Sequence, residues 1–193
     1  MKTEDLKIFL SIPTVETDRL ILRKIEGFDR NDVYEYASDP EVSRFLLWYP
    51  HKDLRFTEEY LKAVRRCYKK NDFFDWAITL KKNGKMIGTA GFTSFDIENN
   101  SAEIGYVLNS AYWGQGIAKE AASAVISFGF RVLSLHRIEA KFMTENERSR
   151  RVAQKCGMIS EGIMRGAIIA KGEYRDIELY SITEEDYKKR INQ

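Results

Sequence analysis

The hydrophobic pattern of the chain changes period at residues 112–120, which read Tyr-Trp-Gly-Gln-Gly-Ile-Ala-Lys-Glu. Residues 102–108 before this segment have the pattern of a strand, whereas apolar residues from Ile117 to Val132 recur every three to four positions, as on one face of a helix. Gly114 and Gly116 remove side chains from the turn, so backbone N–H groups can converge ahead of the helix N-terminus. The segment is typical of a phosphate-binding turn, and equally of an ordinary strand-to-helix connector.

Three strand-like runs precede the turn and predict an antiparallel meander. Residues 73–80 and 86–95 flank an Asn-Gly pair, which is a strong hairpin signal, and a second turn leads into residues 102–108. Residues 137–143 follow the apolar helix closely and alternate charged with apolar residues, so we expect a strand parallel to 102–108.

The remaining segments complete an α+β fold, a mixed sheet with helices on both faces. A helix over 29–38 should end at Asp39-Pro40, and a second helix should begin at Thr57 and run toward Lys70. The other expected elements are a strand over 20–25, a helix over 145–156, strands over 158–168 and 174–182, and a terminal helix over 183–190.

Length and composition favour one domain over residues 1–193 in an ordinary globular protein. The net charge of +2 gives no reason to expect nucleic-acid binding, and no run approaches the roughly 18 apolar residues that a membrane helix needs. Cys67 and Cys156 lack CxxC spacing, and His51 and His136 are isolated. We therefore expect a cytoplasmic protein with free thiols and no metal site.

A second polar constellation lies at residues 144–156. Thr144-Glu-Asn-Glu147 fits a capping box with Thr144 as the N-cap. The helix would then carry Asn146 and Ser149 on one side, together with Cys156. The alternative is that Asn146 is itself the cap and that Ser149 bonds to a helical carbonyl.

Together the glycine turn and the segment from Asn146-Glu-Arg-Ser149 to Lys155-Cys-Gly-Met158 resemble the GNAT superfamily of acetyl-CoA-dependent N-acetyltransferases. The resemblance covers about residues 13 to 190 and points to the ribosomal-protein (RimJ/RimL-type) branch. It implies an acyl-CoA N-acyltransferase fold, with a mostly antiparallel sheet of six to seven strands and a central parallel pair. Further matching segments are residues 16–23, 103–106, 112–114, 161–162, 172–176 and 180–181.

One position departs from the superfamily pattern. The pyrophosphate loop of the superfamily reads Gln/Arg-x-x-Gly-x-Gly/Ala, and Trp113 stands here at the first position. Backbone donors from Gly114 onward do not depend on that side chain.

The resemblance assigns acetyl-CoA as cosubstrate, with no metal. The pantetheine arm would lie beside residues 106–108, which diverge from the next strand, and a backbone N–H near Val107 or Leu108 would polarise the acetyl carbonyl. Asn146 would bind the pantetheine arm, and Ser149 would be the general acid. The expected cofactor-binding residues are Tyr106, Val107, Leu108, Gly114, Gln115, Gly116, Ile117, Ala118, Lys119, Asn146 and Ser149.

Other residues complete the expected site. Glu103 can accept an amine proton directly or through water, and its alternative is a solvated strand carboxylate. The cluster of Arg148, Arg150, Arg151 and Lys155 suits the 3′-phosphate of CoA, although surface solvation also explains it. Residues 45–49 should shape the acceptor side, and Tyr174 and Asp176 are candidates to complete it.

The expected function is direct transfer of an acetyl group from acetyl-CoA to a primary amine, with a protein N-terminal amine as acceptor. A small-molecule N-acetyltransferase acting on an antibiotic or polyamine is an alternative, and so is a non-catalytic acetyl-CoA-binding module. The expected oligomeric state is monomer or homodimer.

Overall fold

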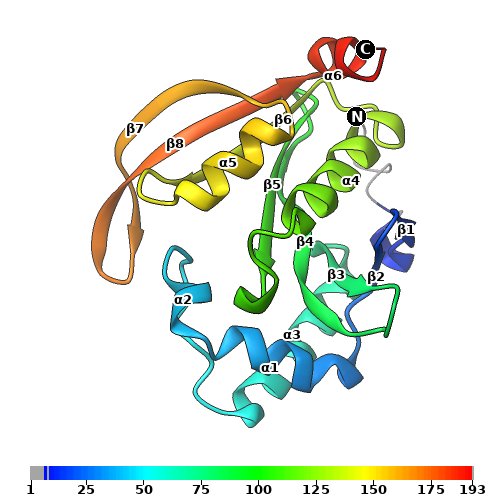
Figure 1. The fold of residues 1–193 in the computed structure, drawn as a ribbon, viewed down its shortest axis with the longest axis vertical. Helices are drawn as coiled ribbons and strands as arrows, with labels where there is room; N and C mark the ends of the chain where they lie inside the picture. Colours follow the sequence, from blue (N-terminus) through cyan, green and yellow to red (C-terminus); the bar gives the residue numbers. More distant parts are fainter. Residues whose placement is uncertain (1–6, 8, 193) are drawn as a thin grey trace.

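The computed structural model describes residue 7 and residues 9–192. Its centre is one mixed sheet with strand order β1-β2-β3-β4-β5-β6-β8-β7 (Figure 1). Every neighbouring pair is antiparallel except β5–β6, which is parallel. This confirms the predicted α+β fold. The strands are β1 (Val15–Glu16), β2 (Leu20–Arg23), β3 (Phe74–Leu80), β4 (Met86–Asp96), β5 (Ser101–Leu108), β6 (Arg137–Met143), β7 (Ile159–Ala170) and β8 (Glu173–Thr183).

The described sheet has eight strands instead of the expected six to seven. The strand that was not predicted is β1, in which Val15 pairs with Leu22 and Glu16 with Ile21. Two residues are too few to show a period of two, so only the pairing with β2 reveals this strand.

The helices agree with the sequence pattern except for α2 and the start of α3. They are α1 (Arg30–Ala37), α2 (Pro40–Ser43), α3 (Leu54–Lys70), α4 (Ile117–Arg131), α5 (Glu147–Lys155) and α6 (Glu184–Ile191). The predicted start of α3 at Thr57 is wrong. The Asp53 side chain accepts a hydrogen bond from the Phe56 N–H and caps the helix, which therefore begins at Leu54, three residues before Thr57.

Short helix α2 was not predicted at all. Asp39-Pro40 does end the preceding helix, but the Asp39 side chain accepts from the Glu41 N–H and Pro40 occupies the first helical turn. A proline at that position starts a helix as readily as it ends one. Asp39 and Pro40 therefore mark both the end of α1 and the beginning of α2.

Strand β3 shows how the helices cover the sheet. Trp76 points to the α4 side, where its ring centroid lies 5.3 Å from that of Phe9 and 5.2 Å from that of Phe128. Its neighbour Asp75 faces the other side, and the Tyr68 hydroxyl of α3 donates to the Asp75 backbone carbonyl at 2.7 Å. Because helices cover both faces, residues 76–80 are all buried.

The parallel pair β5–β6 separates after three residue pairs. Its register ends where Glu103 pairs with Glu139, whereas the β4–β5 ladder continues to the pair of Gly88 and Leu108. The distal half of β5 therefore has a strand partner on one side only. The other side opens toward α5, which follows β6 (Figure 1).

Candidate active site

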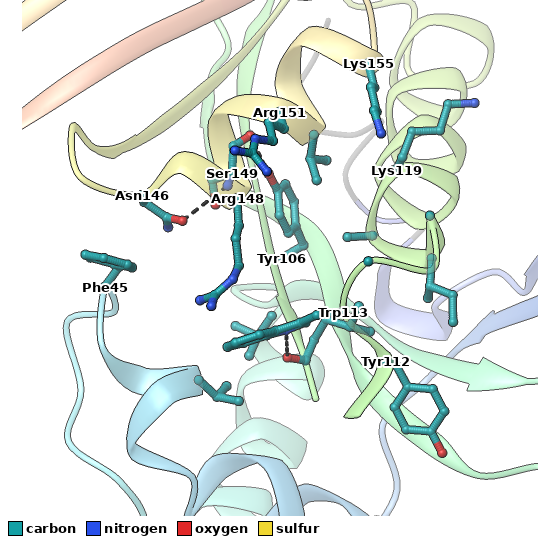
Figure 2. Close-up of a pocket in the computed structure, with 18 of the residues that line it drawn as sticks. Phe45, Tyr106, Tyr112, Trp113, Lys119, Asn146, Arg148, Ser149, Arg151 and Lys155 are labelled. Carbon is teal, nitrogen blue, oxygen red and sulfur yellow. Dashed lines mark hydrogen bonds between the residues drawn. The ribbon is translucent and has the colours of Figure 1, made fainter. Parts of the chain in front are cut away.

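A cavity of about 410 Å³ opens where β5 leaves β6, between the glycine turn, α5 and α2 (Figure 2). The cavity brings together the predicted cofactor-binding residues with one exception, Gln115. The predicted residues that line it are Tyr106, Val107, Leu108, Gly114, Gly116, Ile117, Ala118, Lys119, Asn146 and Ser149.

The two glycines of the turn adopt a conformation that other residues rarely take. Gly114 and Gly116 both have φ of +76°, and Gly116 is the N-cap of α4. A Cβ on Gly114 would meet no atom within 4 Å, so backbone conformation and not space demands glycine there. Gly116, Ile117 and Ala118 line the cavity, so the first N–H groups of α4, which have no partner within the helix, lie at the cavity wall.

An ion pair and hydrogen bonds from the connection between β1 and β2 stabilise the turn. The Glu120 carboxylate accepts from the Thr17 hydroxyl at 2.5 Å and from Arg19 Nε at 2.6 Å, and Arg19 also donates to the Gln115 carbonyl at 3.0 Å. Burial by itself would raise the pKa of Glu120, but these hydrogen bonds outweigh it and the pKa is lowered. Sequence reasoning missed this brace because its members are about 100 positions apart.

Gln115 does not line the cavity. Its side-chain amide donates to the Ala111 carbonyl at 3.0 Å, and the residue is exposed. Any contribution of Gln115 to binding would therefore come from its backbone.

Trp113 forms part of the cavity wall. Its indole N–H donates to the Leu108 carbonyl at 2.8 Å, and the Arg148 guanidinium lies over its ring (Figure 2). The indole thus ties the end of β5 to the turn, which gives a structural role to the residue that departs from the superfamily pattern.

The backbone of β5 offers a free donor to the cavity. The Asn109 N–H donates to the Ile87 carbonyl of β4 at 2.8 Å. Because bonding direction alternates along an antiparallel strand, the Leu108 N–H points away from β4, toward the side where β6 has diverged. Of the two amides considered, that of Leu108 is therefore the one directed into the opening.

Asn146 caps α5, and the predicted capping box at Thr144 is wrong. The Asn146 side-chain oxygen accepts from the Ser149 N–H at 3.2 Å, whereas the Thr144 hydroxyl donates to the Glu145 carboxylate. An asparagine oxygen at the N-cap competes well with a threonine hydroxyl two residues earlier. The amide NH₂ of Asn146 is left to face the cavity.

Ser149 and Tyr106 meet at the inner wall of the cavity. The Tyr106 hydroxyl donates to the Ser149 backbone carbonyl at 3.2 Å, and burial raises the pKa of Tyr106. In the part of the chain that the structure describes, the Ser149 hydroxyl makes no hydrogen bond to a helical carbonyl. The hydroxyl is therefore available to a ligand.

The basic cluster divides into two groups. Arg148, Arg151 and Lys155 line the cavity together with Lys119, and none of these four side chains forms an ion pair with another described residue. Arg150 is different, because it donates to the Glu178 carboxylate and to the Thr144 carbonyl, each at 2.6 Å. Arg150 thus joins α5 to β8 and is not available to a phosphate.

Glu103 lies outside the set of residues that line the cavity. It is on β5 with its side chain toward Lys141 of β6, whose ammonium donates to the carboxylate at 2.9 Å and also pairs with Glu139 at 3.3 Å. Burial alone would lower the pKa of Lys141, but the bond to Glu103 outweighs it and the pKa is raised. The structure does not bring Glu103 together with Ser149.

The residues expected to shape the acceptor side lie on α2 and in the segment after it. Phe45 lines the cavity as expected, but Leu47 and Tyr49 are exposed. Tyr174 is exposed, and Asp176 accepts from the Gly166 N–H at 2.8 Å, so neither lines the cavity. Sequence reasoning missed several lining residues, namely Glu41, Val42 and Tyr112.

Residues 7 and 9–192 contain no group of three or more His, Cys, Asp or Glu side chains placed to hold a metal ion. No helix in these residues is both long and apolar enough to cross a membrane.

Comparison with known proteins identifies the family. Residues 19–159 match the model of the acetyltransferase (GNAT) domain. An uncharacterized N-acetyltransferase, p20 of Bacillus licheniformis, is 35% identical over 174 residues, which cover 90% of this chain and 98% of that protein. The crystal structure of a GNAT-family acetyltransferase from Bacillus anthracis superposes with a TM-score of 0.79 and 31% identity over 90% of this chain and 99% of that one.

A more distant structure holds a ligand. It is RimL, a ribosomal L7/L12 alpha-N-protein acetyltransferase in complex with coenzyme A, with a TM-score of 0.75 and 20% identity over 89% of this chain and 98% of that one. At that identity the likeness supports the fold. The family match and the relatives above 30% identity decide the classification: the chain belongs to the GNAT acetyltransferase family and is an N-acetyltransferase.

Proposed function

We propose that the protein transfers the acetyl group of acetyl-CoA directly to a primary amine, and that the acceptor is the N-terminal amine of a protein. One observation carries the proposal. The glycine turn, Leu108 and four cationic side chains that form no ion pair with another described residue all line one cavity. The acceptor class is supported by the motif resemblance to the RimJ/RimL-type branch.

The phosphate groups of acetyl-CoA would occupy two parts of the cavity. The pyrophosphate suits the glycine turn, since converging N–H groups and the positive end of α4 stabilise anions. The 3′-phosphate suits Arg148, Arg151 and Lys155, whose charges are not already neutralised. The pantetheine arm would then lie along residues 106–108, within reach of the Asn146 amide.

Transfer requires a polarised carbonyl, a neutral amine and a proton for the departing sulfur. The Leu108 N–H would donate to the carbonyl oxygen as negative charge develops there. The amine nitrogen forms the new C–N bond, the C–S bond breaks, and the Ser149 hydroxyl supplies a proton to the thiolate. Ser149 then regains a proton from solvent.

Glu103 remains the proposed base for the amine. Because it does not line the cavity and is paired with Lys141, it would act through water and not by direct contact. Cys156 is not proposed as an acyl carrier, since burial raises the pKa of its thiol and so disfavours the thiolate.

A thiol-release assay with acetyl-CoA tests the proposal against three acceptor classes: peptides with free N-termini, polyamines and aminoglycosides. We expect release with peptides, and no release with the same peptides after N-terminal blocking. Turnover restricted to polyamines or aminoglycosides would replace the proposed acceptor by a small molecule. Tight acetyl-CoA binding without turnover of any acceptor would identify a binding module.

A further inference from the structure

The acceptor end of the cavity contains a carboxylate that no step of the proposed reaction uses. Among the described residues that line the cavity, Glu41 of α2 is the only Asp or Glu. Its single ion pair, to Arg44, is long at 3.9 Å, and both side chains are more than half exposed. An exposed ion pair of this kind contributes little to the free energy of folding, so the Glu41 carboxylate can readily leave Arg44 for another cation.

Two contacts from distant parts of the chain hold α2 in place. The Ser110 hydroxyl, just before the glycine turn, donates to the Asp39 carboxylate at 2.6 Å. At the other end of α2, the Lys171 ammonium from the β7–β8 turn donates to the Ser43 carbonyl at 2.7 Å. A four-residue helix gains little stability from its own hydrogen bonds, so these tethers determine where Glu41 lies.

An aromatic ring lies in this part of the cavity. Phe45 follows Glu41 by four residues and also lines the cavity, whereas the Trp113 ring is already covered by the Arg148 guanidinium (Figure 2). A cation is stabilised both by a carboxylate and by the faces of aromatic rings. The same surroundings give a neutral acceptor no comparable advantage.

We propose that Glu41 is the specificity-determining residue that binds the acceptor amine in its ammonium form and so selects acceptors that are cationic at neutral pH. The proposal rests on the acetyl-transfer function proposed above. After binding, the ammonium proton leaves through water to the base, and the neutral amine attacks the acetyl carbon. Glu41 therefore acts on acceptor binding, and Ser149 and Glu103 act on the chemical step.

The test compares steady-state kinetics of wild type and Glu41→Gln with two acceptors: a peptide with a free N-terminus and an aromatic amine that is neutral at pH 7. For the peptide, we expect KM to rise about 10-fold or more, as loss of one partner of a charged hydrogen bond predicts. KM for the aromatic amine and KM for acetyl-CoA should stay within twofold. Glu41→Asp should recover part of the peptide affinity.

Glu59→Gln is the matched control, because Glu59 is also an exposed helical carboxylate with a long ion pair, at 3.6 Å from Arg55. It should change none of these constants.

A measurement on wild type alone avoids any effect of the substitution on α2. Raising the salt concentration should increase KM for the peptide more than KM for the neutral amine.

The outcomes separate the two proposals. A wild-type enzyme that acetylates no amine contradicts the proposed function. An active wild type in which Glu41→Gln leaves KM for the peptide unchanged, or in which salt affects both acceptors equally, overturns the role of Glu41 and leaves the function intact.

Discussion

The Arg148 guanidinium carbon lies 3.9 Å from the centroid of the Trp113 ring, so α5 and the glycine turn contact each other across the cavity. The same indole donates to the Leu108 carbonyl at 2.8 Å. One side chain therefore links the end of β5, the turn and α5, which are the three elements on which the proposed binding of acetyl-CoA depends.

Replacing Trp113 by Phe should weaken acetyl-CoA binding. The substitution keeps an aromatic ring under Arg148 but removes the hydrogen bond to Leu108, which is worth roughly 1 kcal/mol, or about a 5-fold increase in Kd. Isothermal titration calorimetry measures the effect. Trp48→Phe is the control, since Trp48 packs against the core but does not line the cavity. Equal Kd values for the two variants would refute a role of the indole N–H.

Gly116→Ala tests the conformation of the turn. An alanine at φ of +76° is strained by about 1–2 kcal/mol, and relaxation of the turn would redirect the first N–H groups of α4. We expect a lower Tm and an acetyl-CoA Kd raised at least 10-fold. Gly27→Ala, at a glycine without positive φ whose nearest neighbour would be 3.6 Å away, should leave both unchanged. Undiminished affinity in Gly116→Ala would exclude the turn as the phosphate site.

Ser149→Ala should lower kcat by roughly 10- to 1,000-fold if the hydroxyl protonates the thiolate in the transition state. Acetyl-CoA affinity should change little, because the Asn146 cap uses the Ser149 backbone N–H, which the variant retains. Pre-steady-state rates with a single acceptor measure the chemical step. A rate within twofold of wild type would assign Ser149 a structural role.

Glu103→Gln should lower turnover chiefly near neutral pH, where an ammonium acceptor must lose its proton before attack. Acetyl-CoA affinity should be preserved, since Glu103 does not line the cavity. The informative measurement is the pH dependence of kcat/KM. Coincident pH profiles for the variant and wild type would eliminate Glu103 as the base, directly or through water.

The Asp75 carboxyl, which does not line the cavity, should make the free energy of unfolding depend on pH. Burial raises the pKa of its carboxyl to about 7, and no described residue forms a hydrogen bond or ion pair with that carboxyl. The folded protein therefore holds a proton that the unfolded chain releases above pH 4, so this group's contribution to stability falls as pH rises from about 4 to about 7.

In Asp75→Asn this contribution no longer varies with pH. Relative to wild type, we expect the variant to gain roughly 1–3 kcal/mol of unfolding free energy between pH 5 and pH 8. Urea denaturation at the two pH values measures the difference. A stability difference that does not change with pH would show that Asp75 is ionised in the folded protein throughout this range.

The parts of the site that were predictable depend on residues close together in sequence. Gly114 and Gly116 were found because a period change and a backbone requirement coincide within a few residues. The resemblance to the GNAT superfamily supplied Ser149 and a choice between the amides of Val107 and Leu108, and the hydrogen bond from the Asn109 N–H to the Ile87 carbonyl then distinguishes Leu108 from Val107. Local rules predicted most of the fold, whereas the motif resemblance supplied most of the predicted cofactor-binding residues.

The missed parts depend on pairings that local patterns do not contain. Glu41 reaches the cavity only because Ser110 and Lys171 position α2, and both lie far from it in sequence. In the sequence, Arg150 is indistinguishable from its basic neighbours as a candidate phosphate ligand. In the structure it is paired with Glu178 of β8. Thr144 and Asn146 are both adequate N-cap residues, and only the structure shows that the Asn146 side chain caps α5.

The divergence of β5 from β6 leaves the middle of a sheet with an unpaired backbone edge. In the rest of the sheet, a neighbouring strand forms hydrogen bonds with each such edge. Here a pantetheine arm would lie along residues 106–108, and its amide groups would form those hydrogen bonds instead. The cosubstrate would then act as a removable strand that joins two half-sheets. We therefore expect the two halves to unfold more cooperatively when acetyl-CoA is bound than when the enzyme is empty.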